Sequence, residues 1–167
     1  MTASPWAADG TATAGPWTLA DAAATAALGG RLAAALPAGA TLLLHGDLGA
    51  GKTTLVQGLA SALGIPEPVT SPTFALAQHY SGEGPEGRPT ALVHLDLYRL
   101  EDPASADELF AQEEEEALAL GALLVVEWPG RLSAVPTTCW QLELSLRLAG
   151  DPDAGRLAWL WQPDSGP

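Results

Sequence analysis

Residues 46–53 read GDLGAGKT and match the phosphate-binding pattern G-x-x-x-x-G-K-[ST]. The motif follows the apolar run 41–44, which predicts a buried strand, and precedes a helix predicted over residues 52–63. In this setting glycines allow successive backbone N–H groups to converge on an anion, and the first helical turn adds unpaired donors. Lys52 is expected to reach the β- and γ-phosphates of a nucleotide, and the Thr53 hydroxyl to bind Mg²⁺. A flexible loop in a glycine-rich chain is the competing interpretation, which the flanking strand and helix disfavour.

Strand and helix patterns alternate through the first two thirds of the chain, which predicts parallel strands. Thr18 and Asp21 resemble a capping box at the start of a further helix, which ends near Pro37. We also predict a helix over 105–120 and strands over 74–80, 91–97, 123–126, 140–148 and 157–161. The last two strands flank a GDPDAG turn and predict an antiparallel hairpin.

The expected fold class is therefore α/β, with a P-loop NTPase-like central sheet. That sheet is predicted to be mostly parallel, with helices on both faces and a C-terminal antiparallel hairpin. Residues 1–16 show no periodicity and are predicted to be a flexible N-terminal tail. Residues 17–162 would form a single ATPase domain, and residues 163–167 a short C-terminal tail.

Two apolar runs end in a carboxylate at the sheet edge where the glycine-rich loop is expected. Asp96 ends the run 92–96, and Glu127 ends the run 123–127. A nucleotide-hydrolysing site needs carboxylates there, near the metal or the attacking water. Either acid alone could equally be a strand-terminal residue facing solvent. Both together, in a chain with this motif, favour a role in the site.

Several nearby polar residues have two interpretations. Ser71 and Thr73 lie where nucleotide-binding folds often keep a switch segment, but the surrounding prolines would also make an ordinary turn. Arg99 could neutralise the charge of a γ-phosphate or form a surface ion pair with Glu101 or Asp102.

Other chemistry-bearing residues are predicted to be structural. His94 lies inside a strand and is expected to be packed rather than catalytic, and His45, just before the motif, is only slightly better placed for a role. Cys139 is expected to be an inert core residue. The acidic run 113–116 is interpreted as a solvated helix face.

The chain is strongly acidic: its 167 residues include 20 Asp and Glu against 7 Lys and Arg, for a net charge of −13. Without a basic cluster, tight direct binding to the phosphate backbone of a nucleic acid or to an anionic membrane is not expected. The single cysteine, the lack of a basic secretory leader and the lack of a long apolar run predict a soluble cytoplasmic protein. Lys52 is the only lysine and there is no asparagine, so the guanine-reading motif N-K-x-D is absent and ATP is the expected nucleotide.

Four segments in this order and spacing resemble the bacterial TsaE family: GDLGAGKTT (46–54), SPTF (71–74), HLDLYRL (94–100) and EWP (127–129). The likeness runs from about Thr18 to Trp161. It implies a Mg²⁺-dependent ATPase, weak without partners, that is needed for threonylcarbamoyladenosine formation at position 37 of certain tRNAs. In that family the protein does not transfer the threonylcarbamoyl group. It binds a TsaB–TsaD assembly and hydrolyses ATP to keep the assembly turning over.

The resemblance also implies roles for individual residues. The phosphates would be held by Gly49, Ala50, Gly51, Lys52, Thr53 and Thr54. Thr53 and Glu127 would surround Mg²⁺, Asp96 would orient water or metal, and the division between the two carboxylates stays open. Ser71 and Thr73 would belong to the switch, and Trp128 would pack beside the site. The catalytic set is thus Lys52, Asp96 and Glu127.

In one place the chain departs from the family pattern. The family usually reads E-W-P-E, whereas Gly130 stands here in the place of the last acid. A nucleotide contact through a side chain at that position is therefore in doubt. No motif marks the adenine pocket, for which Arg156 is one candidate.

Two other functions are compatible with the same motif. A small-molecule kinase would need an arginine-rich lid, and the six arginines are scattered along the chain. A nucleotide-gated binding module would bind ATP with negligible turnover.

Overall fold

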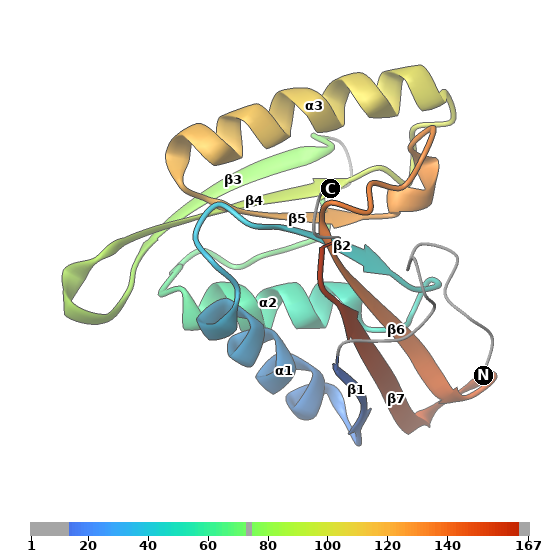
Figure 1. Ribbon diagram of the computed structural model, residues 1–167. Helices are drawn as coiled ribbons and strands as arrows, with labels where there is room; N and C mark the ends of the chain where they lie inside the picture. The colour runs from blue at the N-terminus through green and yellow to red at the C-terminus, as the bar shows by residue number, and fades with distance from the viewer. Residues whose placement is uncertain (1–13, 73–74, 164–167) are drawn as a thin grey trace.

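The structure is a computed structural model that describes residues 14–72 and 75–163. These residues form one seven-stranded sheet with the order β1-β7-β6-β2-β5-β4-β3 (Figure 1). The strands are β1 (Ala14–Leu19), β2 (Thr41–His45), β3 (Ala77–Glu83), β4 (Pro89–Asp96), β5 (Leu123–Glu127), β6 (Trp140–Leu148) and β7 (Asp151–Trp161). The helices are α1 (Ala22–Ala35), α2 (Lys52–Ala62) and α3 (Pro103–Leu120), with short 3₁₀ turns η1 (Pro85–Gly87) and η2 (Pro129–Arg131).

The centre of the sheet is parallel and both edges are antiparallel. Strands β6, β2, β5 and β4 run parallel to one another, β3 is antiparallel to β4, and β7 is antiparallel to β6 and β1. Only five residues separate β3 from β4, which is too short a connection for a parallel crossover. The predicted α/β sheet with its C-terminal hairpin is confirmed.

Helices cover both faces of this sheet, as predicted, with α1 and α2 on one face and α3 on the other (Figure 1). On β2, Leu42 and Leu44 pack in the core with α1 and α2, whereas Leu43 packs in the core with α3. A strand covered on both faces can be apolar throughout, which explains the continuous run on β2. None of the described helices has the length and apolarity needed to cross a membrane.

Helices α1 and α2 touch through their backbones. A Cβ atom at Gly58 would lie 1.9 Å from the Ala26 carbonyl oxygen, and one at Gly29 would lie 2.1 Å from the Leu55 carbonyl oxygen. Real Cβ atoms do not approach that closely, so glycine is required at both positions. This contact fixes α2, whose first turn carries the Lys52 side chain.

The structure corrects several predicted boundaries. Residues 14–16, predicted as part of the tail, begin β1, which pairs with β7; residues 1–13 and 164–167 lie outside the described residues. Thr18 lies in β1, so Asp21 caps α1 instead and accepts a hydrogen bond of 2.8 Å from the Ala24 N–H. Helix α3 starts two residues early, at Pro103, because Asp102 caps it and proline suits the first helical position. The strand predicted over 74–80 is shifted to 77–83.

Candidate functional site

The glycine-rich loop joins the end of β2 to the start of α2, as the motif predicted. Gly49 and Gly51 have φ angles of 83° and 103°, which side chains rarely allow. A Cβ at Gly46 would lie 2.6 Å from the Leu144 carbonyl oxygen. Helix α2 starts without a side-chain cap, so its first N–H groups are available to an anion. The loop can therefore hold a phosphate group.

A cleft of about 410 Å³ opens over this loop. Its lining includes every predicted site residue that the structure describes: Gly49, Ala50, Gly51, Lys52, Thr53, Thr54, Ser71, Asp96 and Glu127. Arg99, Trp128 and Arg156 line it as well. Thr73 lies outside the described residues, so its predicted switch role stays a prediction.

Lys52 is 6% exposed and turns back onto its own loop. Its ammonium donates to the carbonyl oxygens of Gly46 and of Asp47, the latter at 3.3 Å. Burial lowers the pKa of Lys52, and the nearby carboxylates of Glu127, Asp96 and Asp47 oppose that shift. A buried cation held by carbonyls and surrounded by acids is well placed to transfer its donors to an incoming anion.

Asp96 and Glu127 are direct neighbours, because they pair in register on the parallel strands β4 and β5. Asp96 is half-buried and accepts hydrogen bonds from the Ser71 hydroxyl at 3.1 Å and the Tyr98 N–H at 2.9 Å. Glu127 is 3% exposed. With the Thr53 hydroxyl in the same cleft, these carboxylates form an oxygen-only donor set of the kind that Mg²⁺ prefers. The residues present therefore fit a magnesium–nucleotide site.

His94 holds Glu127 in place, a role that the sequence analysis missed. Its side chain is fully buried, as predicted, and its Nε2–H donates to Glu127 Oε2 at 2.6 Å. His94 Nδ1 has no hydrogen-bond partner among residues 14–72 and 75–163. His94 and Asp96 are two residues apart on one strand, so they face the same side of the sheet. That alternation was the available signal, but the partner on β5 depends on the strand register.

Trp128 packs beside the site, as predicted. Its backbone is left-handed, with φ 59° and ψ 49°, a conformation that is strained for a bulky residue. This turn places the indole ring with its centroid 4.2 Å from Lys52 Nζ and 4.8 Å from the Tyr98 ring centroid. Arg131, on η2, also packs here: its guanidinium lies 5.5 Å from the Tyr98 ring centroid. The Lys52 ammonium is thus held by a cation–π contact as well as by carbonyls.

Arg156 braces the outer side of the loop from β7. It donates to the Gly49 and Ala50 carbonyl oxygens, both at 3.1 Å, and to the Pro152 carbonyl oxygen at 2.7 Å. Arg156 lines the cleft while donating to backbone carbonyls, and its suggested place at the adenine end stays a prediction. Gly130 is exposed on η2 and is not part of the lining of this cleft.

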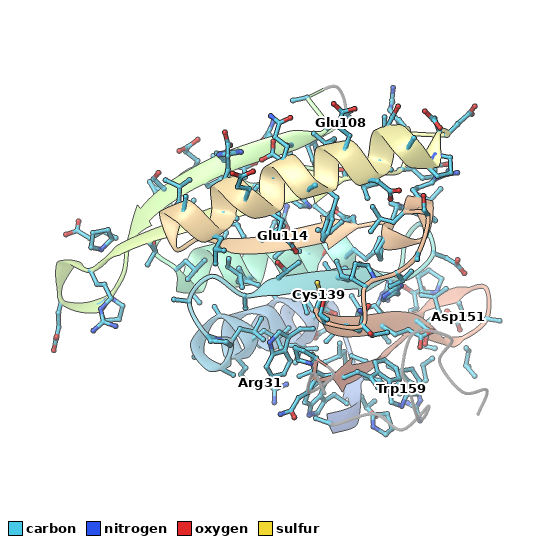
Figure 2. All side chains as sticks on the ribbon, turned by 45° about the horizontal axis from the view of Figure 1, so that its top comes forward. Arg31, Glu108, Glu114, Cys139, Asp151 and Trp159 are labelled. Atoms are coloured by element: carbon cyan, nitrogen blue, oxygen red, sulfur yellow. The ribbon has the colours of Figure 1, made fainter. Side chains whose placement is uncertain are left out.

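Two further residues behave as structural groups. The Nε2–H of His45 donates to Gln141 Oε1 at 2.6 Å, because an amide oxygen can only accept. Burial lowers the pKa of His45 to about 4. Cys139 lies in the core on the α3 side of the sheet, as predicted, and burial raises its pKa to about 11 (Figure 2).

A family model and the most similar curated proteins that we compared name the same family. The family model "Threonylcarbamoyl adenosine biosynthesis protein TsaE" matches residues 19–155. A tRNA threonylcarbamoyladenosine biosynthesis protein TsaE from a Nostoc species is 46% identical over 121 residues, which are 72% of this chain and 71% of that protein. The protein of the same name from Mycobacterium tuberculosis is 41% identical over 142 residues, 82% of this chain and 81% of that protein.

A solved structure has a similar fold. The crystal structure of Bacillus subtilis YdiB superposes with a TM-score of 0.62 and 26% sequence identity, covering 90% of this chain and 87% of that chain. The family model spans most of this sequence, and the relatives above 40% identity cover more than two thirds of it. The chain therefore belongs to the TsaE family, whose members take part in the biosynthesis of threonylcarbamoyladenosine on tRNA.

Proposed function

We propose that this chain is a Mg²⁺-dependent ATPase that supports tRNA threonylcarbamoyladenosine formation by binding and resetting a TsaB–TsaD complex. The observation that carries the ATPase proposal is the convergence of Lys52, Asp96 and Glu127 on one cleft over the glycine-rich loop. This combination of a cation, two carboxylates and a nest of backbone N–H groups is the set that phosphoryl transfer needs. The partners are proposed from the family to which the chain belongs.

The residues divide the work according to their chemistry. The backbone N–H groups of residues 49–54 would bind the phosphates, and Lys52 would exchange its loop carbonyls for phosphate oxygens. Thr53 would bind Mg²⁺ together with a carboxylate of the Asp96–Glu127 pair, and Mg²⁺ when bound supplies charge neutralisation for the phosphates. The remaining carboxylate would orient the attacking water.

The segment around Ser71 gives the site a means of sensing its ligand. The Ser71 hydroxyl donates to Asp96 Oδ2 at 3.1 Å, so it contacts a carboxylate proposed to face the metal or the water. A change in the charge around Asp96 would therefore reach the segment that leads into β3. This is the form of coupling that nucleotide switches use, where γ-phosphate and metal contacts order a loop.

The charge of the chain agrees with a division of labour between subunits. A net charge of −13 opposes direct tight binding to tRNA, so the partner proteins would hold the tRNA while this chain handles ATP. We also propose that the chain acts in the cytoplasm, without a role at the membrane.

The test is Mg²⁺-dependent phosphate release by the full chain with purified TsaB and TsaD. Lys52→Ala and Asp96→Asn should each abolish most of the release, by about 100-fold or more, because each removes charge at the transferring phosphate or its metal. Arg147→Ala is the matched control: it removes a cation from an exposed position outside the cleft and should behave as wild type. Circular dichroism confirms that each variant is folded.

Three outcomes would contradict the proposal. If the wild type releases no phosphate even with both partners, the chain is a nucleotide-gated binding module. If release depends strongly on an added nucleoside or small phosphate acceptor, it is a kinase. If the chain associates with TsaB and TsaD neither with nor without ATP, the proposed partners are wrong.

A further inference from the structure

One imidazole and two carboxylates converge on the far face of the sheet from the nucleotide cleft. His79 lies on β3, and Glu113 and Glu116 lie one helical turn apart on α3, the helix on which Glu108 and Glu114 are labelled in Figure 2. His79 Nε2 is 2.7 Å from Glu113 Oε2 and 3.5 Å from Glu116 Oε2. One ligand atom of each residue lies within 4.8 Å of the other two. Within residues 14–72 and 75–163 this is the only such set of three metal-ligating side chains.

The burial of Glu113 makes this cluster unlike a solvated acidic surface. The Glu113 side chain is only 8% exposed, so the prediction that the whole run 113–116 faces solvent is wrong at this residue. A buried carboxylate is costly unless a partner compensates its charge. Glu116, 54% exposed, brings a second carboxylate to the same nitrogen. A single Nε2–H can donate well to only one of them, which leaves excess negative charge at one point.

One of the two distances from His79 Nε2 matches the spacing between ligands of a tetrahedral metal ion, and the other is shorter. Zinc binds imidazole nitrogen and carboxylate oxygen at about 2.0–2.2 Å, which puts neighbouring ligand atoms about 3.4 Å apart. The separation of 3.5 Å between His79 and Glu116 already has this value. The separation of 2.7 Å to Glu113 must widen by roughly 0.7 Å to reach the same ligand spacing, and His79, whose side chain is 40% exposed, has room to rotate.

We infer that His79, Glu113 and Glu116 form a second divalent-cation site, selective for Zn²⁺ over Mg²⁺ and separate from the nucleotide cleft. An imidazole ligand suits zinc and similar transition metals, whereas Mg²⁺ takes oxygen ligands and keeps much of its water. Three protein ligands leave a fourth position to water. The cleft carboxylates, in contrast, pair with the Thr53 hydroxyl in an all-oxygen set.

The two sites lie on opposite faces of the sheet. His79 pairs in register with Val93, which belongs to the core packed on α3. His94, the next residue on β4, faces the other way and contacts Glu127 of the cleft.

The site would tie an edge strand to a helix. Strand β3 is hydrogen-bonded only to β4, while α3 packs mainly on β4 and β5. Residue Leu76, just before β3, lines the nucleotide cleft, three positions from His79. A cation at the cluster would therefore hold the strand that follows the cleft wall against α3.

The test is metal binding by the full chain after treatment with EDTA, in buffer with excess Mg²⁺ to occupy oxygen sites. Calorimetric titration with Zn²⁺ should give one equivalent bound, and Co²⁺ should give the intense visible absorption of a tetrahedral complex. Loss of a group that only supports a ligand costs about 10–100-fold in affinity, so His79→Ala and Glu116→Gln should each weaken binding by at least about tenfold. Glu115→Gln, an exposed neighbour on the same helix, is the control and should bind as wild type.

A second readout does not depend on the titration. Zinc should raise the midpoint of thermal unfolding of the wild type and of Glu115→Gln, but not of His79→Ala, because a cation that binds only the folded chain stabilises it. Both substituted positions are exposed, so these variants should remain folded. Equal zinc affinity in wild type and His79→Ala would overturn the inference. Loss of zinc binding in Glu127→Gln alone would also overturn it, by placing the ion in the cleft.

Discussion

A methyl group added at Gly29 should push α1 away from α2. The added Cβ would lie 2.1 Å from the Leu55 carbonyl oxygen and 2.8 Å from the Leu59 nitrogen, all backbone atoms of α2. An ordinary contact begins near 3.4 Å, so the two helices would have to separate by roughly 1 Å or tilt. Overpacking of this kind costs about 1–3 kcal/mol, and rigid helix backbones favour the upper part of that range. We therefore expect Gly29→Ala to lower the free energy of unfolding.

The neighbouring glycine supplies a matched control. A Cβ at Gly30 would meet the Ala62 Cβ at 3.7 Å and the Gly58 carbonyl oxygen at 3.9 Å, which are ordinary contacts. In a helix interior, alanine has a helix propensity more favourable than that of glycine by about 1 kcal/mol, so Gly30→Ala should stabilise the fold. The same gain applies at Gly29, so the two variants should differ by the overpacking cost alone, about 1–3 kcal/mol, and a cost near the upper end gives the two substitutions opposite signs.

Urea unfolding followed by circular dichroism measures this difference. In both variants the free energy of unfolding should fall with urea concentration as steeply as in the wild type, while the urea midpoints of unfolding move in opposite directions. Because the first turn of α2 carries Lys52, Gly29→Ala should also weaken Mg²⁺–ATP binding, and Gly30→Ala should not. If Gly29→Ala is as stable as Gly30→Ala, α1 and α2 do not approach as closely as the structure shows and the reasoning fails.

Three further predictions use single side chains. Acidification from pH 7 to 4 should destabilise the wild type by about 3 kcal/mol more than His45→Gln in urea titrations. The sign follows because burial lowers the pKa of His45 to about 4. On acidification the unfolded chain therefore takes up a proton near pH 6.5, before the folded chain does, and unfolding becomes more favourable. If the free energies of unfolding of the two proteins change in parallel with pH, the reasoning is refuted. The Cys139 thiol, whose pKa is raised to about 11, should react with a thiol reagent about 100-fold or more slowly in the folded chain than in urea. ATP should change the fluorescence of the wild type but not of Trp128→Phe, since phosphate draws Lys52 off the indole ring; equal changes would place the signal at another tryptophan.

The core of the site was predictable because its parts are local. The glycine-rich loop, the strand before it and the helix after it are contiguous in sequence, and the two carboxylates each end an apolar run. Parallel strands bring such ends to one edge without any knowledge of register. Position along the chain was therefore enough to place Lys52, Asp96 and Glu127 in one cleft.

The parts that were missed depend on contacts between distant segments. Residues 14–16 form a strand only because β7, more than 130 residues later, offers an edge. His94 gains its role from the register of β4 on β5, which sets its distance to Glu127. Buried Glu113 has its hydrogen-bond partner, His79, on another element, 34 positions earlier in the chain. The sequence periodicity of a single segment does not indicate which residue of a distant segment will contact it.

The placement of acids around Lys52 explains how the proposed site would treat its two ligands. Three carboxylates, those of Asp47, Asp96 and Glu127, act on the one buried ammonium, so the immediate surroundings of Lys52 are negative before any ligand enters. Next to Lys52, a phosphate without a metal ion would be repelled by these three carboxylates and attracted by the ammonium and the loop N–H groups, while Arg99 and Arg156 also line the cleft. A divalent cation bound by the Asp96–Glu127 pair would make these carboxylates its ligands, and they would then no longer repel the phosphates. Because coupling between two ligands is reciprocal, each would raise the affinity for the other by the same factor. A site in which three acids surround the single lysine is therefore suited to bind the magnesium–nucleotide complex as a unit and to discriminate against free nucleotide.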